Sequence, residues 1–70
     1  MTNAEIAKAI KENNLIVLGQ LTESHPRKEQ PPLSNKELQE QLLALIPKQH
    51  PEFWNMLADY YYRLTKKTKQ

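Results

Sequence analysis

Hydrophobic and polar residues alternate with helical spacing in three segments of the chain, and the middle segment shows this most clearly. Its apolar positions are Leu38, Leu42, Leu45 and Ile46. At about 100° per residue these positions share one side of a helix. Ser34 followed by Glu37 is the capping-box pattern that starts a helix, and Pro47 stops the repeat. The pattern predicts a helix over residues 34–46 with one buried face.

The last segment has the same periodicity over a longer stretch. Pro51 suits the first position of a helix, and the carboxylate of Glu52 suits the first turn, where the helix dipole is positive. The apolar stripe that follows is about 60° wide and consists of Phe53, Leu57, Tyr60 and Leu64. Trp54 and Tyr61 widen it. We therefore expect an amphipathic helix over residues 51–67.

The first segment also carries an apolar stripe, but an asparagine pair interrupts it. Thr2 and Glu5 form a second capping-box pattern. Four apolar positions then share one side of a helix: Ile6, Ile10, Val17 and Leu21. The asparagine pair at 13–14 costs a helix only about 0.6 kcal/mol per residue relative to alanine, so we predict one helix over residues 3–22. The alternative is a turn at the pair, after which residues 15–21 form a strand that pairs only between molecules.

Residues 23–33 separate the first two predicted helices and contain three prolines and no aromatic residue. This composition favours an extended, mostly solvated connector. The sequence predicts an all-α fold, a small single domain over residues 1–70 with three helices near 3–22, 34–46 and 51–67. A chain of 70 residues without cysteine has a small core and no disulfide, so we expect support from self-association or from a partner.

Positive charge is concentrated at the end of the chain. Charges cancel over residues 1–33, and residues 34–62 carry four acidic and two basic side chains. The last eight residues carry no acidic side chain and four basic ones: Arg63, Lys66, Lys67 and Lys69. Basic side chains stabilise the C-terminal end of a helix, and we expect residues 67–70 to form a basic tail. The same cluster is a candidate contact for an anionic partner.

The residues that catalysis or cofactor binding needs are absent or badly placed. Phosphate-binding loops require several glycines, and Gly19 is the only glycine. His25 and His50 lack the spacing that puts two metal ligands on one helix face. Ser24 and His25 lie in the predicted connector, which cannot hold a nucleophile in position. We expect no enzyme activity, no cofactor, no metal ion and no small-molecule substrate.

The apolar runs of the chain are short. Residues 15–18 form one such run, far below the roughly 20 residues that span a bilayer. The first fourteen residues mix acidic and basic side chains in a helical pattern, unlike a secretory signal or a transit peptide. We expect a cytoplasmic protein that does not contact a membrane.

Several large apolar side chains fall outside the tightest core sectors of their predicted helices. On a continuous first helix, Leu15 and Ile16 point away from the apolar stripe, so something else must cover them. The full candidate set is Leu15, Ile16, Leu43, Trp54 and Tyr61. Protein interfaces favour such residues, although a packed bundle also uses wide stripes in its own core. Our first hypothesis is a non-catalytic protein interaction module (adaptor, inhibitor or regulatory subunit) whose partner is another protein or a second copy in a homodimer.

Nucleic-acid binding is the alternative hypothesis. The helices predicted over residues 34–46 and 51–67, with their short link, have about the length of a helix-turn-helix. Glu52 and Asp59, however, place negative charge on the helix that would read the bases. In this hypothesis the contact with the phosphate backbone is therefore made by the basic end, Arg63, Lys66, Lys67 and Lys69.

Overall fold

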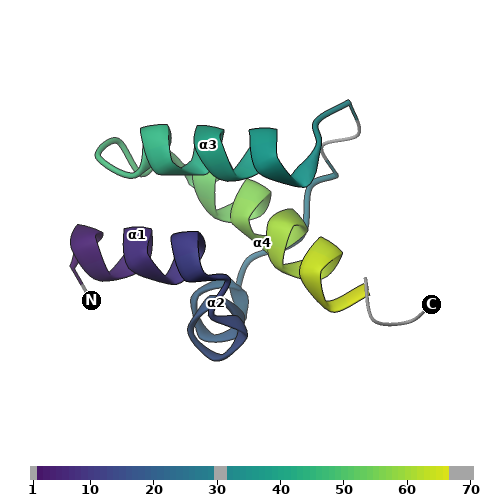
Figure 1. The fold of residues 1–70 in the computed structure, drawn as a ribbon, viewed down its shortest axis with the longest axis horizontal. Helices are drawn as coiled ribbons and strands as arrows, with labels where there is room; N and C mark the ends of the chain where they lie inside the picture. The colour runs from purple at the N-terminus through teal and green to yellow at the C-terminus, as the bar shows by residue number, and fades with distance from the viewer. Residues whose placement is uncertain (1, 30–31, 67–70) are drawn as a thin grey trace.

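The computed structural model describes residues 2–29 and 32–66, which form four α-helices (Figure 1). In chain order these are α1 (Asn3–Glu12), α2 (Leu15–Thr22), α3 (Asn35–Leu45) and α4 (Pro51–Lys66). No strand occurs among these described residues, and none of their helices is long and apolar enough to cross a membrane. The all-α class is confirmed. The predicted count of three helices is wrong, because the first segment folds as two.

The chain turns at the asparagine pair, so the helix predicted over residues 3–22 is broken in the middle. Asn13 adopts φ 54° and ψ 46°, a left-handed conformation that ends α1 and that asparagine tolerates better than most residues. The Asn14 side chain accepts a 3.2 Å hydrogen bond from the Val17 N–H and caps α2. One asparagine stops a helix and the next starts another. Residues 15–21 lie within α2 and do not form the strand of the alternative prediction.

A polar network holds this junction in place. The Tyr60 hydroxyl on α4 donates a hydrogen bond to the side-chain oxygen of Asn13 and accepts one of 3.2 Å from Gln39 Nε2 on α3. The same Gln39 nitrogen donates to the carbonyl of Ile10 at 2.9 Å. Burial raises the pKa of the Tyr60 hydroxyl, which keeps its proton and remains a donor. The network therefore ties the end of α1 to both α3 and α4.

Both predicted capping boxes are present. The Thr2 N–H donates to Glu5 Oε1 at 2.8 Å, and the Glu5 N–H donates to Thr2 Oγ1 at 3.2 Å. Ser34 and Glu37 form the equivalent pair at the start of α3, with distances of 2.9 and 3.2 Å. These bonds satisfy N–H groups that a helix end otherwise leaves unpaired. The hydrogen bond from the Thr2 backbone also lowers the pKa of the Glu5 carboxyl.

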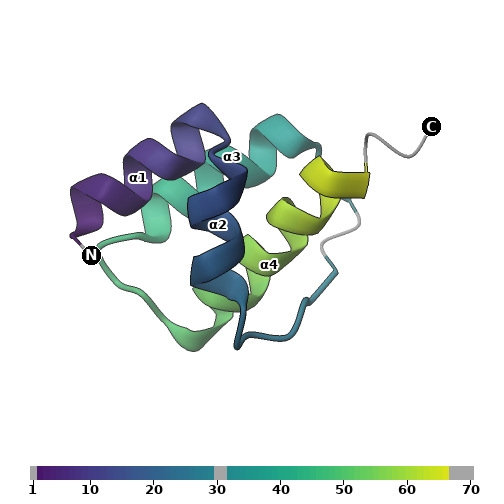
Figure 2. The ribbon, with the colours of Figure 1, turned by 90° about the horizontal axis from the view of Figure 1, so that it is seen from below.

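The core lies where α4 packs against α2 and α3, and α1 closes it by packing against the same two helices (Figure 2). The predicted stripes supply most of the buried side chains, namely Ile6, Ile10, Leu38, Leu42, Ile46, Phe53, Leu57 and Tyr60. Other members of the stripes lie half-buried at the edge, namely Val17, Leu21, Leu45 and Leu64. Leu18 is fully buried although the predicted stripe omits it. The turn at residues 13–14 gives α2 a direction of its own, and this brings Leu18 inward.

The described residues of the connector between α2 and α3, 23–29 and 32–33, are largely exposed, yet they contact α4 at several points. The His25 ring stacks on Trp54 with 5.4 Å between centroids and 17° between planes. The Lys28 N–H donates a 3.3 Å hydrogen bond to the carbonyl of Asn55. Arg27, between these two contacts, forms an ion pair with α4 that is described below. The described part of the connector therefore packs along α4 through these contacts.

Candidate interaction surface

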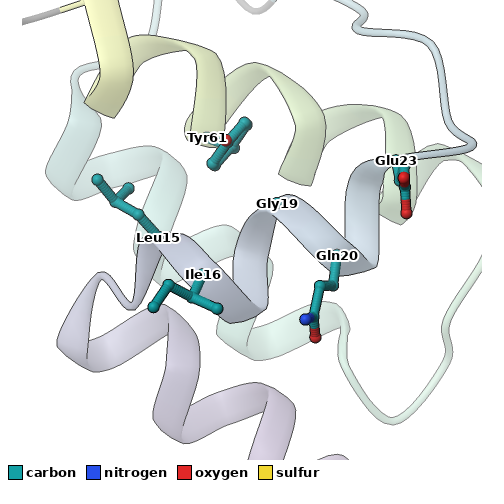
Figure 3. A pocket seen from close by; sticks show the side chains of 6 residues that line it. All are labelled: Leu15, Ile16, Gly19, Gln20, Glu23 and Tyr61. Carbon is teal, nitrogen blue, oxygen red and sulfur yellow. The ribbon is translucent and has the colours of Figure 1, made fainter.

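An open depression lies between α2 and α4 (Figure 3). It has a volume of about 460 Å³ and is lined by Leu15, Ile16, Gly19, Gln20, Glu23 and Tyr61. All of these except Tyr61 belong to α2 or to the residue that follows it, and Tyr61 reaches in from α4 (Figure 3). We call this surface the α2–α4 hollow.

The helix α2 lies at the surface, although its sequence is that of a buried helix. Its eight residues include no charged side chain. Leu18 and Thr22 are buried, whereas Ile16, on the opposite side, is 77% exposed and its neighbour Leu15 is 43% exposed. Helices without a polar face are typical of positions that are covered all round. A single copy of the chain therefore leaves the apolar side chains of Leu15 and Ile16 uncovered at the surface of α2.

Gly19 allows Tyr61 to lie directly against the backbone of α2. A Cβ atom at Gly19 would be 3.1 Å from the Tyr61 hydroxyl oxygen and 3.3 Å from the ring carbon that bears it. Both distances are shorter than ordinary van der Waals contact, so any side chain at this position would push the tyrosine outward. Because residue 19 is a glycine, the Tyr61 ring can pack against α2 and form one wall of the hollow.

A second, smaller depression lies between α1 and α2. It has a volume of about 340 Å³ and is lined by Glu5, Lys8, Ala9, Glu12, Asn14 and Val17. Three exposed residues, Ile16, Gln20 and Glu23, recur at helical spacing along the outer side of α2. They form a ridge, the α2 ridge, with one depression towards α4 and one towards α1. The surface thus offers a projection and two recesses side by side.

The hollow brings together three of the five predicted interface residues, Leu15, Ile16 and Tyr61. The other two, Leu43 and Trp54, are half-buried and pack against the core. The Trp54 ring lies between the stacked ring of His25 and Phe53, which it meets edge-on at 4.8 Å and 80°. Leu43 and Trp54 therefore contribute to the fold and not to the hollow.

Sequence reasoning missed the three other residues that line the hollow. Gly19 and Gln20 lack the apolar bulk that marks an interface, and Glu23 lies in the segment predicted as connector. The sequence spacing does indicate two of these residues, because Gln20 and Glu23 follow Ile16 by four and seven residues and so share its side of a helix. This signal becomes visible only when α2 is treated as a helix of its own.

Asp59 is completely buried, so the expectation that it presents negative charge at the surface is wrong. Its Oδ1 lies 2.8 Å from Arg27 Nε, and its Oδ2 lies 3.1 Å from Arg63 Nε. Arg63 also donates a 2.6 Å hydrogen bond to the carbonyl of Leu33. Two guanidinium groups balance this carboxylate. Arg63, a member of the predicted basic cluster, thereby joins α4 to the residues that precede α3.

The exposed ring of Tyr62 carries two cationic side chains. The guanidinium carbon of Arg27 lies 4.0 Å from the ring centroid, and Lys66 Nζ lies 5.4 Å from it. These distances are typical of cation–π contacts. Lys67 and Lys69, the other two lysines of the predicted basic cluster, lie outside the described residues. Of the predicted nucleic-acid contact, the structure places Arg63 inside an ion-pair network and Lys66 at the surface.

The chemistry of the hollow is apolar contact with a few polar groups at its margin. Leucine, isoleucine and tyrosine supply the contact area, and one amide and one carboxylate are the remaining side-chain groups. Among residues 2–29 and 32–66, no cluster of three or more histidine, aspartate or glutamate side chains could hold a metal ion. Comparisons with protein-family models, with curated proteins and with solved structures find no match to this chain.

Proposed function

We propose that the chain is a small non-catalytic interaction module that binds a protein surface through the α2–α4 hollow and the α2 ridge. The observation that carries the proposal is Ile16, which is 77% exposed on a helix that has no charged side chain. Complete burial of a side chain of this size stabilises a complex by about 1.5–3 kcal/mol. Covering Ile16 is therefore a substantial source of binding free energy.

The surroundings of Ile16 support the same function. The centres of protein interfaces are depleted in charged residues and enriched in aromatic ones. The hollow matches this composition, because Tyr61 forms one wall and Glu23, at its end, is its one charged residue. Gly19 brings Tyr61 against α2, so the aromatic ring is held in place before a partner binds, which lowers the entropic cost of binding.

A pull-down from the source cells tests this function with two matched variants. Ile16→Glu places a charge at the centre of the surface, and Ala44→Glu makes the same change at an exposed position on α3. The proposal predicts that wild type and Ala44→Glu retain the same protein, that Ile16→Glu loses it, and that nuclease changes none of these results. Equal retention by Ile16→Glu, or loss of the partner after nuclease treatment, contradicts the proposal.

Nucleic-acid binding by the basic end is the second candidate. The observation in its favour is the Tyr62 ring, which is 38% exposed and carries the cations of Arg27 and Lys66. Aromatic rings beside basic groups are the stacking platforms of proteins that bind single-stranded nucleic acid. In this function Lys66, Lys67 and Lys69 contact phosphates and Tyr62 stacks on a base. The lysine substitutions described in the Discussion separate the two functions.

A further inference from the structure

We propose that the partner of this surface is a second copy of the chain, packed through α2 in an antiparallel, twofold-symmetric dimer. The inference rests on the proposed function and names the occupant of the same site. Three features of the surface favour a copy of itself, namely its shape, the absence of charged side chains from α2 and the position of Glu23.

The shape of the surface is self-complementary. In a twofold interface the same patch is used on both sides, so every projection must meet a recess of the same patch. The α2 ridge is a projection, and it lies between depressions of about 460 and 340 Å³. Two copies that cross at α2 place the ridge of each in a depression of the other, as helices pack ridge into groove.

The charge pattern permits this contact and selects its direction. The eight residues of α2 carry no charged side chain, whereas the depression towards α1 is lined by Glu5, Lys8 and Glu12. The ridge of each copy, which ends in Glu23, therefore fits the less charged α2–α4 hollow of the other. With the twofold axis near the level of Leu18, Ile16 of one copy comes level with Gln20 of the other. Glu23 then comes level with the start of the other α2, where the helix dipole is positive. A parallel arrangement would instead set two Glu23 carboxylates side by side.

The size of the chain sets the share of its surface that a stable dimer must cover. A standard stable interface covers about 800 Å² on each partner, which is about one sixth of the 4716 Å² surface of the described residues. A dimer through the outer side of α2 therefore has to cover about one sixth of the surface of each chain.

Sedimentation equilibrium from micromolar to hundreds of micromolar chain tests the dimer. Wild type and Ala44→Glu should pass from the mass of one chain to that of two. Ile16→Glu should raise the dimer dissociation constant by about thirtyfold or more, because it places a charge in the centre of the interface. Circular dichroism of Ile16→Glu should show the wild-type helix content, since Ile16 is largely exposed in the single chain.

Single-cysteine variants test the direction, because the chain has no cysteine of its own. In the antiparallel dimer, the two copies of position 20 are about 6 Å apart along the helix axis, and those of position 23 about 15 Å apart. A disulfide requires Cα atoms within about 7 Å. The lateral distance between the two helices adds to these axial offsets, so the position 20 pair lies near this limit and the position 23 pair lies far beyond it. Oxidised Gln20→Cys should therefore form a linked dimer much faster than Glu23→Cys, and the opposite order contradicts the antiparallel packing.

The mass of the chain and the capture of a protein together distinguish failure of the dimer from failure of the proposed function. A wild-type chain that keeps the mass of one copy at every concentration overturns the dimer, as does a dimer that Ile16→Glu leaves intact. If the chain is monomeric and still loses a captured protein upon Ile16→Glu, the surface binds a different protein and the proposed function stands. If Ile16→Glu changes neither mass nor capture, both are overturned.

Discussion

The carboxylate of Asp59 lies 2.8 Å from Arg27 Nε, and this pair fastens the connector to the middle of α4. Asp59 is completely buried, and Arg63 one turn along α4 closes its other side. A carboxylate placed in this way fixes the position of Arg27, and Arg27 in turn lies over the Tyr62 ring. The ion pair between Arg27 and the buried Asp59 therefore holds the connector against α4.

Asp59→Asn should loosen the connector. The substitution removes the charge that balances Arg27 and Arg63, and we expect the free energy of unfolding to fall by about 1–3 kcal/mol. Urea unfolding followed by circular dichroism measures this loss, and limited proteolysis should show faster cleavage within residues 23–33. The control is Glu52→Gln, because Glu52 forms an exposed pair with Lys28 at 3.4 Å whose loss costs at most about 1 kcal/mol. Equal losses in the two variants would contradict the account.

The helical phase of α4 can be tested with one buried and one exposed residue. Leu57 is fully buried at the centre of the apolar stripe, whereas Tyr62 lies outside the stripe and is exposed. Leu57→Ala should lower the free energy of unfolding by about 2–5 kcal/mol, because it leaves a cavity in the core. Tyr62→Ala should cost less than about 1 kcal/mol, the size of its exposed cation–π contacts. The reverse order in urea unfolding would mean that the assigned faces of α4 are wrong.

The basic end separates the two candidate functions. Replacing Lys66, Lys67 and Lys69 with glutamine should leave protein binding unchanged and lower the free energy of unfolding by at most about 1–2 kcal/mol, through the lost interaction with the helix dipole. If the basic end binds nucleic acid, the same variant should bind DNA or RNA more weakly, with a salt dependence reduced by about one unit of slope per lost phosphate contact. A fluorescence anisotropy titration at several salt concentrations distinguishes these outcomes. A strong, salt-dependent affinity that disappears in the variant would favour the second candidate.

The first capping box should contribute stability that depends on pH. The hydrogen bond from the Thr2 backbone lowers the pKa of the Glu5 carboxyl from its ordinary value of 4.5. A carboxyl whose pKa is lower in the folded state stabilises the fold above the unfolded pKa, and this contribution disappears as the pH falls through the folded pKa. Wild type should therefore exceed Glu5→Gln in stability at neutral pH, and the difference should shrink on acidification. Urea unfolding over this pH range measures it, and a difference that grows as the pH falls would contradict the assignment.

The capping boxes and apolar stripes were sufficient to predict α3 and α4 from the sequence, because both signals depend on residues close together in the chain. The break between α1 and α2 depends on a distant one. Asparagine costs a helix little by itself, and the turn is secured by the hydrogen bond from Tyr60 to Asn13. Helical periodicity contains no information about such a contact. The prediction of one helix over residues 3–22 is therefore wrong at residues 13–14, where tertiary contacts stabilise a turn.

The same distinction explains which parts of the surface could be predicted. Leu15, Ile16 and Tyr61 fall outside the tightest core sectors of their predicted helices, which is a local property. The same criterion also selects Leu43 and Trp54, which pack against the core. The burial of Asp59 was missed, because only its spacing from Arg63 is local and Arg27 reaches it from the connector. The recess beside Tyr61 was missed for a similar reason, since it depends on where α2 crosses α4.

Site-specific photo-crosslinking in the source cells tests most directly whether the outer side of α2 is a protein-binding surface. A photoreactive side chain at Gln20 lies in the α2–α4 hollow and leaves Ile16 intact, and the same group at Ala44 on α3 provides the control. The account predicts a defined covalent adduct with a protein, either a second copy of the chain or another protein, from position 20 and not from position 44. No adduct at position 20, or equal adducts from both positions, would contradict it.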